Sequence, residues 1–345
     1  MSSLIRRLRE LLGAIIDALR GIAWRPRCAI AWRPTALAPV FYGYRDFGTA
    51  EGAPGDVRVF YPSLDGSPAS SEILKDCGKY PLVVFAHGHC NTDNDHFLKW
   101  FEVPAQLARA GYVVAVPRLP EIAAGTSPLQ ANGDLAILRN LISWMRSHWS
   151  DRGVVAAPPA TGLVGHSFGA GLAGRLATEG SVTAFASLSG SVARAIREAI
   201  SAPKLFVWGS GEFVPPGVAL TDAEWASVGS PKHRAVVDDL EHWDYLPPGR
   251  TSCEVGRGPC GPFWMTWDLV TMFLANHLRP PAVSTLPSQI PESLVPPLPL
   301  TLTEDQQFFA GGWLSGFPAF ADEASTCQLT ISWDTAGGAG TLTLP

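Results

Sequence analysis

The sequence predicts an α/β protein with a mostly parallel central β-sheet and helices on both faces. Short, continuous apolar runs recur along the chain, such as LVVFA within residues 80–88, and these are typical of strands covered on both faces. Helical patterns alternate with these strands, as in folds with parallel crossovers. Hydrophobic residues make up 46% of the chain, which is enough to fill a large core.

The elements follow one another in a regular order. We expect strands at residues 41–49, 56–62, 80–88, 112–116, 161–167, 182–190, 204–209 and 233–240. We expect helices at residues 96–110, 133–149 and 262–278, and a Gly/Ala-rich helix immediately after Ser167. Gly111 is a suitable C-cap for the first of these helices.

The N-terminal segment, residues 1–40, predicts an amphipathic helix. Residues 4–19 place apolar side chains on one helical stripe, with arginines beside it. Asp17 and Arg20 interrupt the apolar run that a cleaved signal peptide needs. We therefore favour a helix packed on the protein body, with weak contact of residues 4–20 to a membrane surface as the alternative.

The C-terminal part has a different composition. Residues 280–300 hold seven prolines and predict an extended linker. Residues 301–345 contain alternating apolar and polar stretches and predict a small β appendage.

Charge and cysteine content exclude some classes of function. The formal net charge of −5 gives no basic field for nucleic acid. The six cysteines include no C-x-x-C pair, which argues against a zinc ribbon. Cys77 with Cys90, and Cys253 with Cys260, could form disulfides or stay free thiols, so the redox compartment is left open. A cytoplasmic location is the preferred interpretation, with secretion or peripheral membrane attachment as alternatives.

The segment Gly165-His166-Ser167-Phe168-Gly169 carries the first chemical signal. The bare G-x-S-x-G pattern arises by chance, but here it follows the apolar strand TGLV and opens the helix FGAGLAGRLA. Serine on a tight strand-to-helix turn between glycines forms a nucleophile elbow. The context therefore predicts Ser167 as a nucleophile, with an ordinary helix N-cap serine as the alternative.

A second signal, His87-Gly88-His89, ends the strand at 80–88. In hydrolases with a nucleophile elbow, the loop after this strand contributes one backbone N–H to the oxyanion hole. The residue after the nucleophile contributes the other. We expect the amides of His89 and Phe168 in these roles, although both histidines could be ordinary loop residues. A metal site could be suspected from four nearby residues, His89, Asp93, Asp95 and His96. Acyl transfer by a triad needs no metal, so we expect neither a metal nor a cofactor.

A serine nucleophile also needs a base and an acid that orients the base. In hydrolases with a nucleophile elbow, the triad residues follow one another along the chain in the order serine, acid, histidine. His242 lies just after the strand predicted at 233–240 and is the expected base. Glu212 follows the strand at 204–209 and is the expected acid, which should lie about 2.6–3.2 Å from the His242 ring. Three rival carboxylates are Asp238, Asp239 and Asp244.

Together these residues resemble the bacterial α/β-hydrolases related to dienelactone hydrolases, cutinase-like polyester (PET) hydrolases and platelet-activating-factor acetylhydrolases. The resemblance covers residues 41–278 and rests on VRVFYP, LVVFAHGH, GLVGHSFGAG, KLFVWGSGE and EHWDYL. It implies an α/β-hydrolase catalytic domain at 41–279 with the site residues named above. Two departures are Glu212, where these families mostly have aspartate, and Ser167, where a dienelactone hydrolase proper has cysteine.

The resemblance implies hydrolysis of a carboxylic ester through an acyl-enzyme, with a small-molecule, lipid or polymer ester as substrate. Two other functions fit the same residues. An acyltransferase would use the same triad with an alcohol or amine in place of water. A non-catalytic binding protein would keep only the fold. The sequence does not indicate an oligomeric state.

Overall fold

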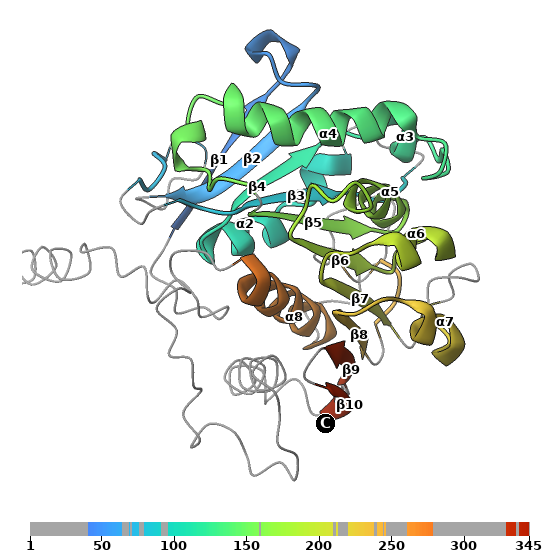
Figure 1. The fold of residues 1–345 in the computed structure, drawn as a ribbon. Helices are drawn as coiled ribbons and strands as arrows, with labels where there is room; N and C mark the ends of the chain where they lie inside the picture. Colours follow the sequence, from blue (N-terminus) through green and yellow to red (C-terminus); the bar gives the residue numbers. More distant parts are fainter. Residues whose placement is uncertain are drawn as a thin grey trace, which may run out of the picture.

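The computed structural model describes residues 41–63, 69, 71–75, 79–90, 96–158, 160–209, 212, 220–237, 240–243, 245, 261–278, 329–335 and 338–344. Within these ranges the protein has the predicted α/β architecture, a mostly parallel sheet with helices on both faces (Figure 1). The helix expected at residues 4–20 and the proline-rich linker at 280–300 lie outside the described residues.

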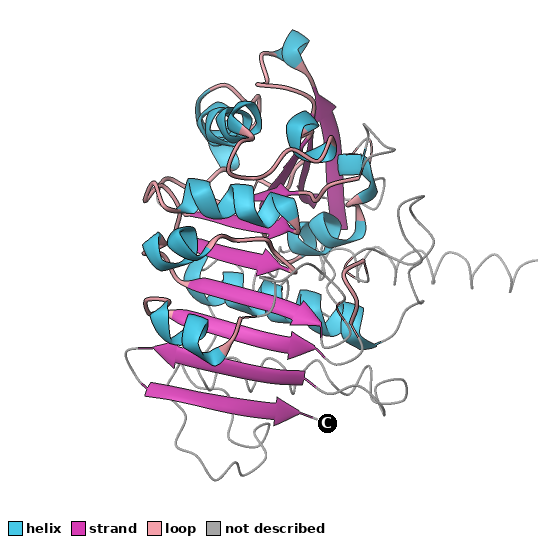
Figure 2. Ribbon diagram, turned by 90° about the vertical axis from the view of Figure 1, so that its right-hand side faces the viewer, coloured by secondary structure: helices cyan, strands magenta, loops and turns pink. Residues whose placement is uncertain are grey.

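One ten-stranded sheet forms the centre of the molecule, with the strand order β1-β2-β4-β3-β5-β6-β7-β8-β9-β10. The strands from β4 to β8 in this order are parallel, whereas β1, β2, β9 and β10 pair antiparallel to their neighbours. Figure 2 shows the strands side by side as a twisted ladder. The strands are β1 Phe41–Phe47, β2 Val57–Ser63, β3 Leu82–Ala86, β4 Val113–Pro117, β5 Thr161–His166, β6 Ala184–Leu188, β7 Lys204–Gly209, β8 Lys232–Val237, β9 Leu329–Thr335 and β10 Gly338–Leu344.

Helices cover both faces of this sheet. Helices α2 and α8 pack with one apolar cluster, and α4, α5 and α7 contribute to a second cluster on the other face. All residues of β3, β4, β5, β6 and β7 are buried, as their continuous apolar runs predict. The α-helices are α2 Glu102–Arg109, α3 Pro120–Ala123, α4 Asn132–Ser147, α5 Phe168–Ala177, α6 Arg194–Ala199, α7 Asp222–Ser227 and α8 Gly261–Leu278.

The helix predicted at 96–110 is wrong as a single element. The chain forms a short 3₁₀ helix, His96–Lys99, and then begins α2 at Glu102. Pro104 explains the break, because proline has no N–H for a carbonyl four residues earlier and its ring clashes there. Proline is tolerated in the first turn of a new helix, which is where Pro104 lies in α2.

The strands near the C-terminus form part of the central sheet. β9 pairs antiparallel with β8 over the whole length of that strand, from Lys232 opposite Asp334 to Val237 opposite Leu329. β10 then forms a hairpin with β9. The predicted β segment at 301–345 therefore continues the sheet through these two strands.

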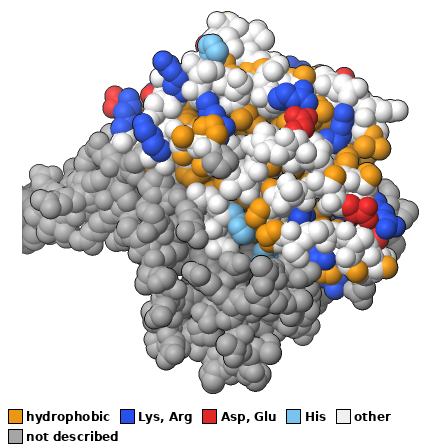
Figure 3. All heavy atoms as spheres, viewed as in Figure 1, with side chains coloured by type: hydrophobic (Ala, Val, Ile, Leu, Met, Phe, Trp, Pro, Cys, Tyr) orange, Lys and Arg blue, Asp and Glu red, His pale blue; other side chains and the backbone are white. Residues whose placement is uncertain are grey.

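The described surface is mixed in charge. On the face in Figure 3, basic and acidic side chains are spread among uncharged ones and lie next to each other in several places. Ion pairs among the described residues include Arg139 with Glu179 at 2.5 Å and Arg58 with Asp46 at 2.7 Å. In the part of the chain that the structure describes, no helix combines the length and apolar character needed to cross a membrane.

Candidate active site

Ser167 lies on the turn between β5 and α5, at the carboxyl edge of the parallel strands. Its φ of 53° places a non-glycine residue in the left-handed region, which is strained for a side chain of this kind. Three backbone hydrogen bonds hold the turn. The Ser167 amide donates to the carbonyl of Leu188 at 3.0 Å, and the Ser167 carbonyl accepts from the amides of Ala170 at 3.1 Å and Ser191 at 3.2 Å. This geometry is that of the predicted elbow.

Gly169 allows α5 to begin directly against β3. A Cβ at this position would lie 2.2 Å from the carbonyl oxygen of His87 and 2.3 Å from that of Ala86. Both contacts are with backbone, which cannot rotate away as a flexible side chain could. The glycine after the serine is therefore required by the close approach of the helix to the neighbouring strand.

His242 lies within hydrogen-bond reach of Ser167. Its Nε2 is 3.0 Å from Ser167 Oγ, and its side chain is 13% exposed. The backbone of His242 is held as well, because the Nε2–H of His166 donates to the His242 carbonyl at 2.8 Å. The two imidazole rings also pack together, with their centroids 4.8 Å apart.

Glu212 is the carboxylate that the structure brings to His242. Its Oε2 lies 3.9 Å from His242 Nδ1, and both atoms are buried without a hydrogen-bond partner among the described residues. The distance is longer than the predicted 2.6–3.2 Å. Three donors hold the other oxygen, Oε1: the Ser189 hydroxyl, the Gly209 amide at 2.8 Å and the Tyr245 hydroxyl at 2.9 Å. These bonds fix one side of the carboxylate and leave Oε2 facing the imidazole.

The two amides predicted for the oxyanion hole belong to neighbouring residues in space. The rings of His89 and Phe168 stack with centroids 5.9 Å apart and an interplanar angle of 22°. Gly88 passes directly against the elbow, since a Cβ there would lie 2.9 Å from His166 Nδ1 and 3.0 Å from Ser167 Cβ. Phe168 is the first residue of α5, and amides of a first helical turn have no acceptor within the helix.

His87 has a structural role in this loop. Its Nε2 accepts from the Leu119 amide at 3.1 Å, so the proton is on Nδ1, which donates to the Gly88 carbonyl at 2.9 Å. Burial lowers the pKa of His87 to about 4 and outweighs that second bond, so the ring is neutral at physiological pH. His87 thereby ties the loop after β3 to the loop after β4.

The rival acids cannot be compared with Glu212, because Asp238, Asp239 and Asp244 lie outside the described residues. The same is true of Asp93 and Asp95 in the suspected metal cluster. Within the ranges given above, no three His, Cys, Asp or Glu side chains are grouped so that they could hold a metal ion.

Sequence reasoning missed three residues of the site: His166, Ser189 and Tyr245. His166 occupies the variable position of the elbow, where the pattern gives no role. Ser189 follows β6 with a φ of 43°, and a serine there looks like any strand-to-loop residue in the sequence. Tyr245 offered a weak signal, because it lies three residues after His242 in EHWDYL.

One cysteine falls within the described residues. Cys90, directly after the predicted oxyanion loop at residues 87–89, is buried and disulfide-bonded. Cys77, its possible partner in the sequence analysis, lies outside the described residues, as do Cys253 and Cys260.

Comparison with models of known protein families and with curated protein sequences found no match to this chain.

Proposed function

We propose that this chain is a serine hydrolase of the α/β-hydrolase type that cleaves carboxylic esters through an acyl-enzyme. The observation that carries the proposal is the 3.0 Å contact of His242 Nε2 with Ser167 Oγ, on a serine held at positive φ between strand and helix. A helix N-cap serine would be expected to accept from an amide of its own helix. The Ser167 side chain makes no such capping bond.

In the proposed reaction, His242 Nε2 takes the Ser167 hydroxyl proton as Oγ attacks the ester carbonyl carbon. The amides of His89 and Phe168 stabilise the negative charge on the carbonyl oxygen. His242 then donates its proton to the leaving alcohol as the C–O bond breaks, and the acyl group stays on Ser167. A water molecule repeats the sequence with His242 as base, releasing the acid and the free serine.

Glu212 acts on His242 in this proposal. A carboxylate beside Nδ1 keeps the Nδ1–H tautomer and stabilises the imidazolium that forms during attack. Oε2 is the free oxygen on that side, 3.9 Å from Nδ1. Catalytic hydrogen bonds are often long in free enzymes and tighten when substrate binds.

Fluorophosphonate labelling and hydrolysis of p-nitrophenyl acetate test the proposal together. The wild-type protein should react with both, and Ser167→Ala should lose labelling and several orders of magnitude in kcat. The melting temperature of the variant controls for folding. If Ser167→Ala keeps near-normal hydrolysis, Ser167 is not the nucleophile and the proposal fails.

The cytoplasmic location stays a prediction, and the disulfide at Cys90 weighs against it. Disulfides persist mainly in secreted and periplasmic proteins, because cytosolic reductants keep thiols reduced. We therefore propose an oxidising compartment. Free thiol counting on protein isolated under native, alkylating conditions tests this directly.

A further inference from the structure

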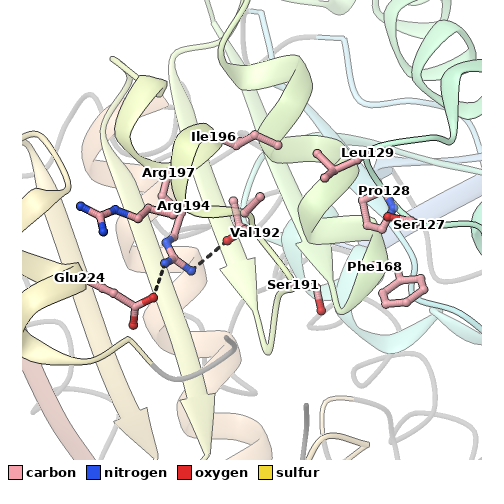
Figure 4. Close-up of a pocket in the computed structure, with 11 residues that line it drawn as sticks. Ser127, Pro128, Leu129, Phe168, Ser191, Val192, Arg194, Ile196, Arg197 and Glu224 are labelled. Carbon is pink, nitrogen blue, oxygen red and sulfur yellow. Dashed lines mark hydrogen bonds and ion pairs between the residues drawn. The ribbon is translucent and has the colours of Figure 1, made fainter. Parts of the chain in front are cut away.

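A groove opens beside the candidate nucleophile. It has a volume of about 340 Å³ and is lined by residues of the loop between α3 and α4, the start of α5, the loop after β6, α6 and α7. Two lining residues are next to Ser167: Phe168 follows it in the chain, and the Ser191 amide donates to the Ser167 carbonyl at 3.2 Å. Figure 4 shows Phe168, Pro128 and Leu129 on one side of the groove and Glu224 on the far side.

The groove and the catalytic histidine lie on opposite faces of the sheet. His242 packs on His166, whose ring contacts Trp100 and Tyr245, and both of these belong to the apolar cluster under α2 and α8. The apolar residues of the groove, such as Phe168, pack on the cluster under α4 and α5. Ser167 therefore sits between His242 on one side and the groove on the other.

This arrangement decides which half of an ester enters the groove. In the tetrahedral intermediate the carbonyl carbon carries Ser167 Oγ, the oxyanion, the leaving oxygen and the acyl carbon. The leaving oxygen must face His242 Nε2, which gives it a proton, and the oxyanion must face the amides of His89 and Phe168. The acyl carbon takes the remaining direction, away from His242 and toward the side on which the groove opens.

The lining of the groove favours an uncharged aliphatic chain. Its apolar side chains are those of Pro128, Leu129, Phe168, Val192, Ala193 and Ile196. The charges at its far end are paired: Arg197 Nη2 binds Glu224 at 2.7 Å and Arg194 Nε binds Glu198 at 2.7 Å. Glu198 lies outside the groove lining, but its ion pair with Arg194 and that of Glu224 with Arg197 give each arginine of the groove a carboxylate partner.

We propose that this groove is the acyl-binding site and that it takes straight, uncharged acyl chains of medium length. The inference rests on the proposed function, since it needs Ser167 to form the acyl-enzyme. The groove's volume of about 340 Å³ is within the range of small-molecule sites, about 300–1,000 Å³, and leaves room for a chain of several carbons. Leu129 is 58% exposed at the groove and would be covered by such a chain.

Two ester series separate the acyl side from the alcohol side. The first varies the acyl chain of p-nitrophenyl esters from acetate to dodecanoate, and the second varies the alcohol of acetate esters from ethyl to decyl. In the wild-type protein, kcat/KM should rise with acyl length by up to about fourfold per methylene until the groove is full. It should depend much less on alcohol length.

Variants within the groove make the test specific. Ala193→Phe fills the groove and should lower the decanoate-to-acetate ratio of kcat/KM by about tenfold, the value of roughly two buried methylene groups. Leu129→Ala removes an exposed contact without filling a packed site and should lower the ratio by about threefold. Ala199→Phe places the same new side chain at the exposed end of α6, outside the groove, and should leave the ratio unchanged.

The outcomes distinguish this inference from the function on which it rests. If the wild type hydrolyses esters but Ala193→Phe and Leu129→Ala keep its acyl-length profile, the groove is not the acyl site. The same conclusion follows if these variants change the alcohol profile instead. If the wild type hydrolyses no ester in either series, the proposed function itself is wrong.

Discussion

Replacing Glu212 with glutamine tests the proposed triad by exchanging one carboxylate oxygen for an NH₂ group. The three donors on Oε1 decide how the new amide group is oriented. The Ser189 hydroxyl, the Gly209 amide and the Tyr245 hydroxyl all donate to that oxygen, so the amide oxygen must take its place. The NH₂ group of glutamine then takes the position of Oε2 and faces His242 Nδ1.

The expected magnitude follows from this orientation. An NH₂ group can only donate, so His242 Nδ1 must accept and its proton must move to Nε2. Nε2 then donates to Ser167 Oγ and can no longer accept the serine proton. The wrong tautomer costs about 10⁴ in kcat in a serine protease triad, which corresponds to roughly 5.5 kcal/mol in activation free energy.

The assay is the steady-state kcat for an activated short-chain ester, with the melting temperature as a folding control. Glu179→Gln is a matched control, because it makes the same chemical change in a surface ion pair with Arg139. It should leave kcat within about twofold, since exposed ion pairs contribute little. If Glu212→Gln keeps more than about a tenth of wild-type kcat while Asp238→Asn or Asp239→Asn is severe, the acid assignment is wrong.

Three further outcomes follow from the same structure. Tyr245→Phe removes one donor to the Glu212 carboxylate. It should lower kcat by about tenfold, because a hydrogen bond to a charged group contributes about that much in free energy. A kcat equal to that of the wild type would contradict a positioning role for Tyr245. Burial lowers the pKa of His87 to about 4 and of His233 to about 3, and raises that of Asp134 to about 6. Between about pH 6 and about pH 4, the unfolded chain therefore carries about two protons on these histidines, whereas the folded chain carries about one, on the aspartate. These groups should lower the free energy of unfolding by about 1.4 kcal/mol per pH unit in urea titrations, and a flat pH dependence would refute the reasoning. Reduction of the disulfide at Cys90 should lower the melting temperature and, because the oxyanion loop precedes it, also kcat; unchanged values with dithiothreitol would show that it does not support the loop.

Much of the fold could be predicted because its signals are local. The buried strands are continuous apolar runs, and the elbow is a five-residue pattern between a strand and a helix. The prediction of one helix at 96–110 is wrong because Pro104 separates two helical elements there. The short helices α3, α6 and α7 were missed, since four to six residues cannot show a repeating apolar face.

Site residues could be predicted where a motif or the order of residues in the chain indicates their role. Residues that act only through contacts between separate loops could not. Ser167 and His242 follow from motif context, and they lie 3.0 Å apart although 75 residues separate them in the chain. The bonds from Ser189 and Tyr245 to Glu212 depend on how three separate loops meet, and no spacing in the sequence encodes that. For the same reason the 3.9 Å distance from Glu212 to His242 could not be foreseen.

The pairing of β9 with β8 has a consequence for synthesis of the protein. β8 leads into the segment that carries His242, yet its outer edge is covered by residues 329–335, which are made about a hundred residues later. On a ribosome adding 5–20 residues per second, roughly, β8 emerges seconds before its partner and exposes an open row of backbone donors and acceptors during that time. The nascent chain is therefore most prone to aggregate in the interval before residues 329–335 leave the exit tunnel.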